Sequence, residues 1–206
     1  MGQYYKAVTK GTKYVVYSRD VIINGAPEYT MAKLTEHSWW GNKFVEGVCK
    51  DLFASAAPLR VAWVGDYADG LLEWKKEKSF NGLTQKDIER LHERAWHTEG
   101  IPVADNDFSL KGLFLVNHTK KEYVACDPYF YRCAVPDDYG EVWCLHPLPL
   151  LTCIGNGLGG GDFFEGDYTR GSTYENVGRW AWDLISIADH APEGFTELKP
   201  IFREIA

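Results

Sequence analysis

The sequence predicts an α+β fold in which two principal helices pack on an antiparallel-rich sheet. Aromatic residues are abundant, with 8 Trp, 12 Tyr and 10 Phe, and they favour strands. Two segments in the first half of the chain, 39–54 and 84–97, have helical periodicity. Short strand-like segments do not alternate regularly with these helices, which argues against a doubly wound sheet. The 206 residues are expected to form a single domain, 1–206.

Both expected helices have a capping residue in front of an apolar stripe. In the segment 39–54, apolar residues recur every four positions, and Ser38 is placed to cap the N-terminus. In the segment 84–97, Thr84 and Asp87 have the spacing of a capping box. Apolar and charged residues then alternate with a period that gives one buried and one solvent-facing side.

The expected strands are rich in β-branched and aromatic residues and are bounded by Gly, Pro or Asn. The first two form a hairpin around Gly11. In chain order, the expected strands are 4–8, 14–17, 29–34, 59–64, 113–116, 122–126, 141–145, 148–154 and 179–187.

Composition excludes several classes of function. The net charge is −7, from 29 acidic and 22 basic residues, which argues against extended binding to nucleic acid. No apolar run of 18 residues predicts a membrane span, and the N-terminus lacks an apolar secretion signal. The five cysteines are odd in number and include no CxxC pair. We therefore expect a cytoplasmic protein with free thiols.

The segment GNGLGGGD at 155–162 is the most informative motif. Its five glycines within seven positions favour positive φ angles or a close approach of another group. Gly155, Gly157 and Gly160 satisfy GxGxxG, but the acidic and aromatic residues that follow do not open a helix well. A dinucleotide site needs that helix, and no Lys-Ser or Lys-Thr completes a phosphate-binding P-loop. No cofactor is therefore expected.

The glycine-rich loop nevertheless has the composition of a binding site. Its backbone N–H groups could form an anion-binding nest, with charge supplied by a nearby arginine. The candidate binding residues here are Gly157, Gly159, Gly160, Asp162 and Arg170. The alternative is a long connection whose glycines serve only tight turns or bulges.

Two other segments are expected to contribute side chains to this site. Aromatic and polar residues at the start of the first helix could contact a ligand, as could the residues that follow the strand 59–64. These candidates are His37, Trp39, Trp40, Asn42, Asp66 and Tyr67. The alternative is that the first group forms a cap and core aromatics, and that Asp66 after Gly65 only closes a turn.

Cysteine chemistry and a zinc site are both weakly supported. Cys144 and His146 would share one face of a strand at about 7 Å, too far for direct activation of the thiol. The nearest histidines in sequence, His92 and His97, lack the spacing of a zinc motif, and no metal ligand is assigned.

Several blocks resemble a family of uncharacterised bacterial and phage proteins. They are the GQYYK start, the EHSWWGNKFV block at 36–45, WVGDYA at 63–68, the GNGLGGGD loop and the tail GFTEL at 194–198. The blocks extend over the whole chain. The resemblance implies no activity and only a setting, bacteria and their viruses, in which inhibitors and sequestering proteins are common.

The functional expectation is a small binding protein. It would capture a partner protein or a small anionic, nucleotide-like ligand, as an inhibitor or sequestering protein in bacterial–phage conflict. The alternative is a metal-dependent hydrolase of a nucleotide or phosphodiester that uses Asp66, Asp69 and Asp162. A hydrolase requires these carboxylates to converge in a cleft, whereas a binding protein requires only stacking faces and hydrogen-bond donors.

Overall fold

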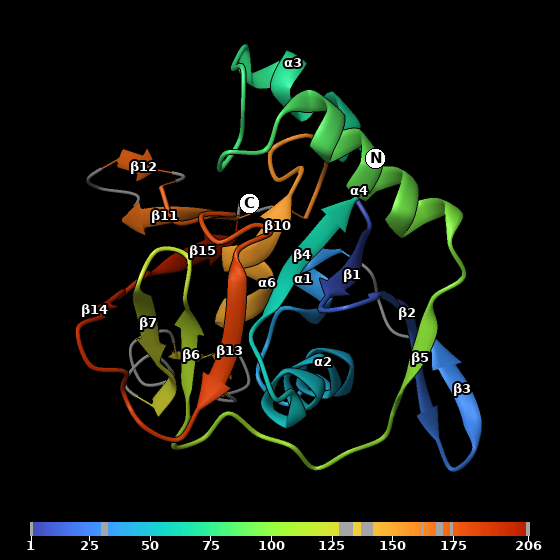
Figure 1. Cartoon of the computed structure of the whole chain (residues 1–206), viewed down its shortest axis with the longest axis vertical. Helices are drawn as coiled ribbons and strands as arrows, with labels where there is room; N and C mark the ends of the chain where they lie inside the picture. Colours follow the sequence, from blue (N-terminus) through green and yellow to red (C-terminus); the bar gives the residue numbers. More distant parts are fainter. Residues whose placement is uncertain are drawn as a thin grey trace.

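The computed structural model describes residues 2–29, 33–127, 134–136, 142–161, 163–167, 171–173 and 175–204. Within these ranges the protein is α+β, with helices packed on a mixed, mostly antiparallel sheet of ten strands (Figure 1). None of the described helices is long and apolar enough to cross a bilayer.

The first half of the chain contains the two longest described helices. Its elements are β1 (Tyr5–Lys10), β2 (Tyr14–Ile23), β3 (Ala26–Tyr29), α1 (Leu34–His37), α2 (Lys43–Ala54), β4 (Leu59–Gly65), the 3₁₀ turn η1 (Ala68–Gly70), α3 (Leu71–Lys75), α4 (Gln85–His97) and β5 (Ile101–Ala104). The second half contributes β6 (Phe114–Asn117), β7 (Glu122–Ala125), β8 (Ala134–Pro136), β9 (Val142–Cys144), α6 (Pro147–Thr152), β10 (Cys153–Ile154), β11 (Phe163–Asp167), β12 (Gly171–Thr173), β13 (Leu184–Ala188), β14 (Thr196–Glu197) and β15 (Phe202–Glu204).

The main sheet has the order β14-β7-β6-β13-β4-β1-β2-β3, with β10 also paired to β4 and β5 to β2. The pairs that involve β10, β5 and β14 are parallel, and the others are antiparallel. Strands β12-β11-β15 form a separate small sheet, and β8 pairs with β9. The strand order places β4 and β1 at the centre of the molecule.

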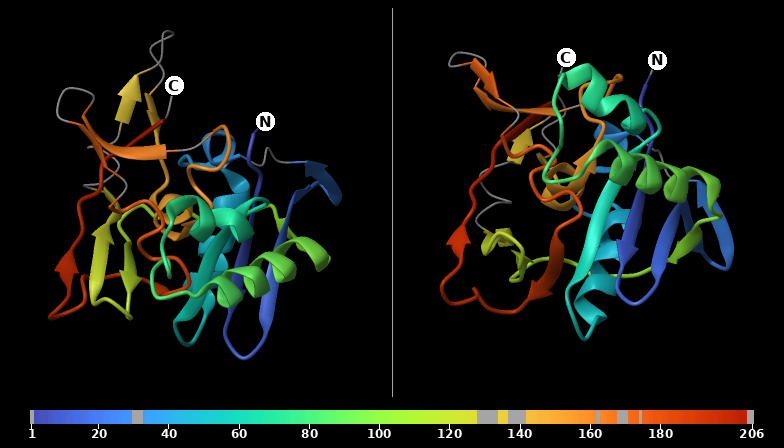
Figure 2. Two further views of the ribbon diagram at one scale, coloured as in Figure 1. Left: turned by 90° about the horizontal axis from the view of Figure 1, so that it is seen from above. Right: turned by 45° about the horizontal axis from the view of Figure 1, so that its top comes forward.

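The two central strands divide the core into two layers, because alternate side chains point to opposite faces of a sheet. Trp63 of β4 and Tyr5 of β1 pack in the cluster that includes α2. Ala62 of β4 and Val8 of β1 pack in the cluster that includes α3 and α4. Helices α2 and α4 therefore cover opposite faces of the central sheet (Figure 2).

Helix α2 begins later than expected from the sequence. Its N-cap is Asn42 rather than Ser38, because the Asn42 side-chain oxygen accepts hydrogen bonds from the N–H groups of Phe44 and Val45. The residues before it form the separate short helix α1. The apolar stripe itself is confirmed, since the predicted residues of α2 are buried.

Helix α4 confirms the second predicted helix almost residue for residue. Thr84 and Asp87 form the expected capping box, in which each side chain accepts from the other residue's backbone N–H. Ile88, Leu91 and Ala95 are the buried face of the helix.

Three predicted strands differ in the structure. The segment 148–154 is mostly helical, because Pro147 opens α6 and the His146 ring accepts the Leu148 N–H as a cap. The segment 179–187 is a strand only from Leu184, since the positive φ of Trp182 breaks the preceding part. The strand expected over 29–34 lies earlier, in β3, and Leu34 begins α1.

Candidate functional site

The glycine-rich loop packs against the first residues of the chain. The Gln3 N–H donates to the Gly160 carbonyl at 3.1 Å, and Gly2 forms a bridge with Gly160. A Cβ atom on Gly159 would lie 2.6 Å from the Gln3 Cβ, closer than real side chains come. Glycine at this position therefore permits a close contact between two backbone segments.

The loop also packs against the residue after Tyr67 and against the start of α1. A Cβ on Gly155 would lie 3.4 Å from the Ala68 Cα, just beyond β4, and Gly161 lies against Lys33 beside α1. On a third side, a Cβ on Gly157 would lie 2.7 Å from Cη2 of Trp74. These contacts are tight packing, and they are made with Lys33, Ala68 and Trp74, which are not among the residues predicted for the site.

The space left beside the loop is small. A cavity of about 10 Å³ is lined by Leu71, Lys75, Phe80, Gly155, Asn156 and Val177. That volume suffices for about one water molecule. It is far below the roughly 300 Å³ at which small-molecule sites begin.

The carboxylates expected near the loop have structural contacts. Asp66 Oδ1 accepts the Tyr4 N–H at 3.1 Å, and the Gln85 side chain donates to the Asp69 backbone carbonyl at 2.7 Å. Tyr67 is 36% exposed. In the described ranges, no group of three or more His, Cys, Asp or Glu side chains is placed to hold a metal ion. Asp162 and Arg170 lie outside the described residues.

The candidates at the first helix lie mostly in the core. His37 is fully buried, and its Nε2 accepts the Trp63 indole N–H at 3.0 Å. Burial lowers the His37 pKa to about 4, so the ring is neutral at pH 7. The Trp39 indole donates to the Glu36 carbonyl, while Trp40 packs on the His146 ring at 5.4 Å between centroids. With Asn42 as the cap of α2, this group holds α1, α2 and the segment before α6 together.

A buried cysteine–histidine contact joins α2 to the residue before α6. Cys49 Sγ lies 3.7 Å from His146 Nε2. His146 Nδ1 accepts the Leu148 N–H, so the ring's hydrogen is on Nε2, which cannot take a proton from the thiol. Burial also raises the Cys49 thiol pKa well above its usual value and lowers the His146 pKa to about 3. The pair is inert as a nucleophile and base.

A groove lies beside the second half of α4. Its volume is about 460 Å³, within the range of small-molecule sites. It is lined by Tyr14, Arg90, Glu93, Arg94, His97 and Thr98. None of the site residues expected from the sequence is in this lining.

Cationic side chains gather around Tyr14 in this groove. The Arg94 guanidinium carbon lies 4.9 Å from the centre of the Tyr14 ring, and Lys10 Nζ lies 4.8 Å from it. Arg90 lies one helical turn before Arg94. Across the part of the chain that the structure describes, no salt bridge pairs Lys10, Arg90 or Arg94 with a carboxylate. With two arginines against one glutamate, Glu93, the groove lining carries a net positive charge on a protein of net charge −7.

Tyr14 is backed by a second aromatic ring from a distant part of the chain. Trp182 stacks on Tyr14 with ring centroids 5.9 Å apart and planes 14° apart. Trp182 has φ +64°, a conformation that bulky side chains rarely adopt. Its N–H donates to the Val61 carbonyl at 2.7 Å, and its own carbonyl accepts from Arg60 at 2.8 Å.

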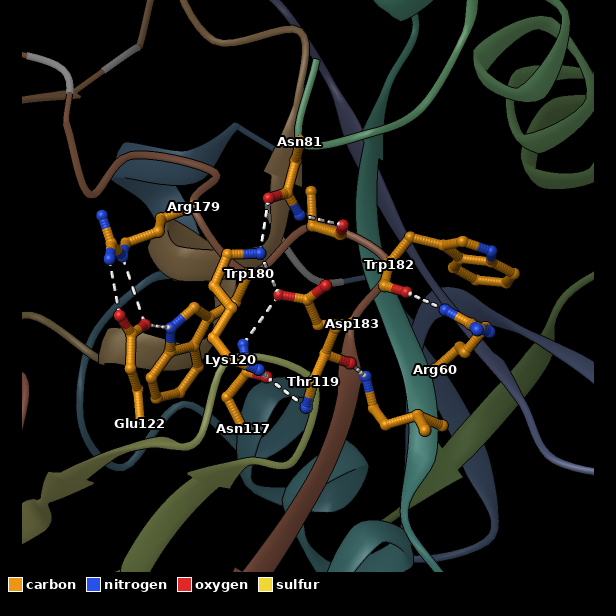
Figure 3. A network of polar contacts seen from close by, with 12 residues as sticks. Arg60, Asn81, Asn117, Thr119, Lys120, Glu122, Arg179, Trp180, Trp182 and Asp183 are labelled. Atoms are coloured by element: carbon orange, nitrogen blue, oxygen red, sulfur yellow. Dashed lines mark hydrogen bonds and ion pairs between the residues drawn. The ribbon is translucent and has the colours of Figure 1, made fainter. Parts of the chain in front are cut away.

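A buried polar network fixes the turn that carries Trp182 (Figure 3). The Asp183 carboxylate, 5% exposed, accepts from Lys120 at 2.7 Å and from Asn117 at 2.8 Å. Lys120 also donates to Asn81, whose amide donates to the Ala181 carbonyl at 2.6 Å. Because these bonds tie β6, β13 and the segment before α4 to the turn, the position of the Trp182 backbone is determined from several sides.

Comparison with known proteins identifies no relative. No family model, no curated protein and no solved structure matches the chain. The candidate site therefore rests on geometry and chemistry alone.

A sequence signal for the groove existed on α4. Arg90, Arg94 and His97 recur at intervals of four and three, which places them on one face of the helix. In sequence this spacing is indistinguishable from an ordinary solvent-facing side. Only the fold brings Lys10 and Tyr14 of the first hairpin to the same place.

Proposed function

We propose that the protein is a binding protein that captures a small anionic, nucleotide-like ligand in the groove beside α4. The observation that carries the proposal is a 460 Å³ groove lined by Arg90 and Arg94, neither of which forms a salt bridge to any described carboxylate, with Lys10 over the ring of Tyr14, which also lines the groove. Two arginines outnumber the one carboxylate of the lining, Glu93, and an anionic ligand relieves the repulsion between them.

The chemistry of the lining favours a phosphate-like group. Arginine presents a planar fork of donors that matches two oxygens of a phosphate or carboxylate. Arg90 and Arg94 are exposed on neighbouring turns of a rigid helix, so both can address one anion. Glu93 also lines the groove and can accept a hydrogen bond from a ligand's amino or hydroxyl group.

The same geometry supports binding over hydrolysis. A metal-dependent hydrolase would need the carboxylates of Asp66 and Asp69 to join further ligands. Asp66 Oδ1 instead accepts the Tyr4 N–H, and the contact of Asp69 with Gln85 is through its backbone carbonyl rather than its carboxylate. In the cytoplasm of a bacterium, infected by a phage or not, capture of a nucleotide-like ligand would serve sequestration or inhibition. Seating an acidic segment of a partner protein in the same groove is the competing outcome of the test below.

The test is calorimetric titration of the intact protein with pyrophosphate and with AMP at low ionic strength. The double variant Arg90→Gln/Arg94→Gln should weaken both affinities at least about tenfold, because each charge-assisted hydrogen bond contributes roughly 1.5–3 kcal/mol. Raising the salt concentration should weaken binding to the wild-type protein as well.

The matched control is Lys86→Gln. Lys86 is exposed on α4 but does not line the groove, so this variant should bind both probes with nearly wild-type affinity. An equal loss of affinity in the double variant and in Lys86→Gln would show that binding depends only on the net charge of the protein. If neither probe binds the wild-type protein, the proposal fails, and a partner protein's acidic segment becomes the occupant to test.

A further inference from the structure

We infer that Tyr14 and Trp182 form a stacking platform that reads the planar base of the ligand, so that the groove selects nucleotides over other phosphates. The inference rests on the proposed function, because the platform would bind the base of the same ligand whose anionic group the arginines bind. It adds Trp182, which lies outside the groove lining, as a residue that positions Tyr14.

The first support is the placement of Tyr14. Tyr14 is 41% exposed and lines the groove, where Lys10 and Arg94 lie over its ring. Stacking of a base on an aromatic side chain strengthens binding and tolerates different bases, since each base has a π face. The stack with Trp182 supports the ring from behind, with planes only 14° apart.

The second support is the backbone conformation of Trp182. Five non-glycine residues in the described ranges have positive φ, and the others are Asn24, Lys76, Asn81 and Lys121. Asparagine tolerates this region, and Lys76 ends a helix there, but for tryptophan it is costly. Strain of this kind persists where surrounding bonds over-determine it, and it often marks a functional position.

The third support is the polar network around Asp183. Its bonds hold the backbone on both sides of Trp182, while the Trp182 ring points away from the Asp183 cluster (Figure 3). The network thus fixes the turn that places the Trp182 ring beside the exposed Tyr14. Here the fixed ring determines the orientation of Tyr14 at the groove.

The cations link the platform to the anion site. Arg94 and Lys10 both lie within about 5 Å of the Tyr14 ring centre, so a phosphate that they bind sits next to the platform. A phosphate would draw both cations toward itself and uncover the ring for the base of the same molecule. Base and phosphate binding are therefore expected to reinforce each other.

The experiment compares AMP with ribose 5-phosphate, which carries the sugar and phosphate without the base. The intact wild-type protein should bind AMP about tenfold more tightly, the magnitude typical of one stacked base. Tyr14→Leu should abolish the preference for the base, so that AMP and ribose 5-phosphate bind this variant with equal affinity. Tyr14→Phe, which keeps the ring, should retain the preference for AMP.

Two further variants separate positioning from folding. Trp182→Leu should lose most of the preference for AMP, and its melting curve shows whether it folds. Because Tyr14 is exposed, Tyr14→Leu tests the platform even if Trp182→Leu does not fold. Trp74→Leu, which removes a 52% exposed tryptophan outside the groove lining, should keep the preference and serves as the control.

The outcomes distinguish the two proposals. If ribose 5-phosphate and AMP bind the wild-type protein equally, the platform is wrong and the anion site stands. If neither binds, both proposals fail. A short single-stranded oligonucleotide that binds much more tightly than AMP, with the same loss in Tyr14→Leu, would assign the base to a strand end rather than to a free nucleotide.

Discussion

At the level of single residues, three titratable side chains lie deep in the core. Glu46 of α2 is 2% exposed, and His37 and His146 are fully buried. Burial disfavours the charged form of each, so the Glu46 pKa rises to about 7 and the pKa values of His37 and His146 fall to about 4 and 3. The Gly41 N–H and the Lys43 ammonium favour the charged form of Glu46, but less than burial opposes it.

Glu46 makes the folding stability depend on pH near neutrality. Its folded pKa of about 7 lies above the unfolded value, so the folded state alone holds the proton between about pH 4.5 and 7. Stability present at low pH is therefore lost as the pH rises through 7. Glu46→Gln should gain up to roughly 3 kcal/mol over wild type between pH 5 and pH 8.

Urea unfolding of both proteins at the two pH values measures this effect. The difference between variant and wild type isolates Glu46, because the histidines titrate in both proteins. Parallel pH profiles would show that Glu46 is ionised in the folded core.

The tight packing of the glycine-rich loop makes a second residue-scale prediction. Gly159→Ala places a methyl group where the Gln3 Cβ and backbone N–H already lie, so it should destabilise the fold by about 1–3 kcal/mol. Gly70→Ala is the control, because nothing lies within 4 Å of the added Cβ. Thermal unfolding measures both. An unchanged melting temperature with lost ligand binding would instead make the loop a binding element.

At the level of secondary-structure elements, helix α4 both packs on the sheet and lines the groove. Ile88, Leu91 and Ala95 attach α4 to the sheet, while Arg90 and Arg94 on its outer side form the groove. Arg94 lies in the last turn of α4, where its positive charge interacts favourably with the helix dipole, so the same charge also stabilises the helix. Helix α2 only packs on the sheet and is buried along most of its length.

The buried face of α2 makes the element-scale prediction. Phe44 is 1% exposed and packs edge-on against Trp63 at 6.1 Å between ring centroids. Phe44→Ala should therefore cost about 2–4 kcal/mol of unfolding free energy. Lys50→Ala, at an exposed position of the same helix, should change stability by no more than about 0.5 kcal/mol. A small loss for Phe44→Ala in urea unfolding would contradict the assigned core face.

The whole molecule is organised around strands from both ends of the chain. β1 lies at the centre of the sheet, and β10 joins β4 in parallel beyond α6. The loop that follows β10 then returns over Gln3. Many contacts of the sheet therefore join residues that are far apart in the sequence.

For the whole molecule we predict that all five cysteines are free thiols. Cys49, Cys126, Cys144 and Cys153 are buried in the described structure, and Cys133 lies outside the described residues. Thiol titration of denatured, unreduced protein should count five thiols, and burial should make the four described thiols slow to react in the native protein. A count of three or one would reveal a disulfide and overturn the expectation from the sequence.

Local chemistry determined much of the fold from the sequence alone. Thr84 and Asp87 specify the start of α4 without reference to the rest of the chain. The periodicity of α2 and the hairpins also depend on neighbouring residues, and they were predicted correctly. Where two local signals competed, the prediction was wrong: the apolar run after His146 has the composition of a strand, but a proline and a capping ring begin a helix there.

The tertiary structure decided the location of the candidate site. The glycine-rich loop was the obvious motif, yet its glycines lie against Gln3 and Trp74, contacts that no local pattern encodes. The groove needs Tyr14 from the first hairpin and Arg94 from α4, and its platform needs Trp182 from a turn near the C-terminus. Sequence periodicity fixes which face a residue occupies on its own element, whereas the packing of elements decides which faces meet.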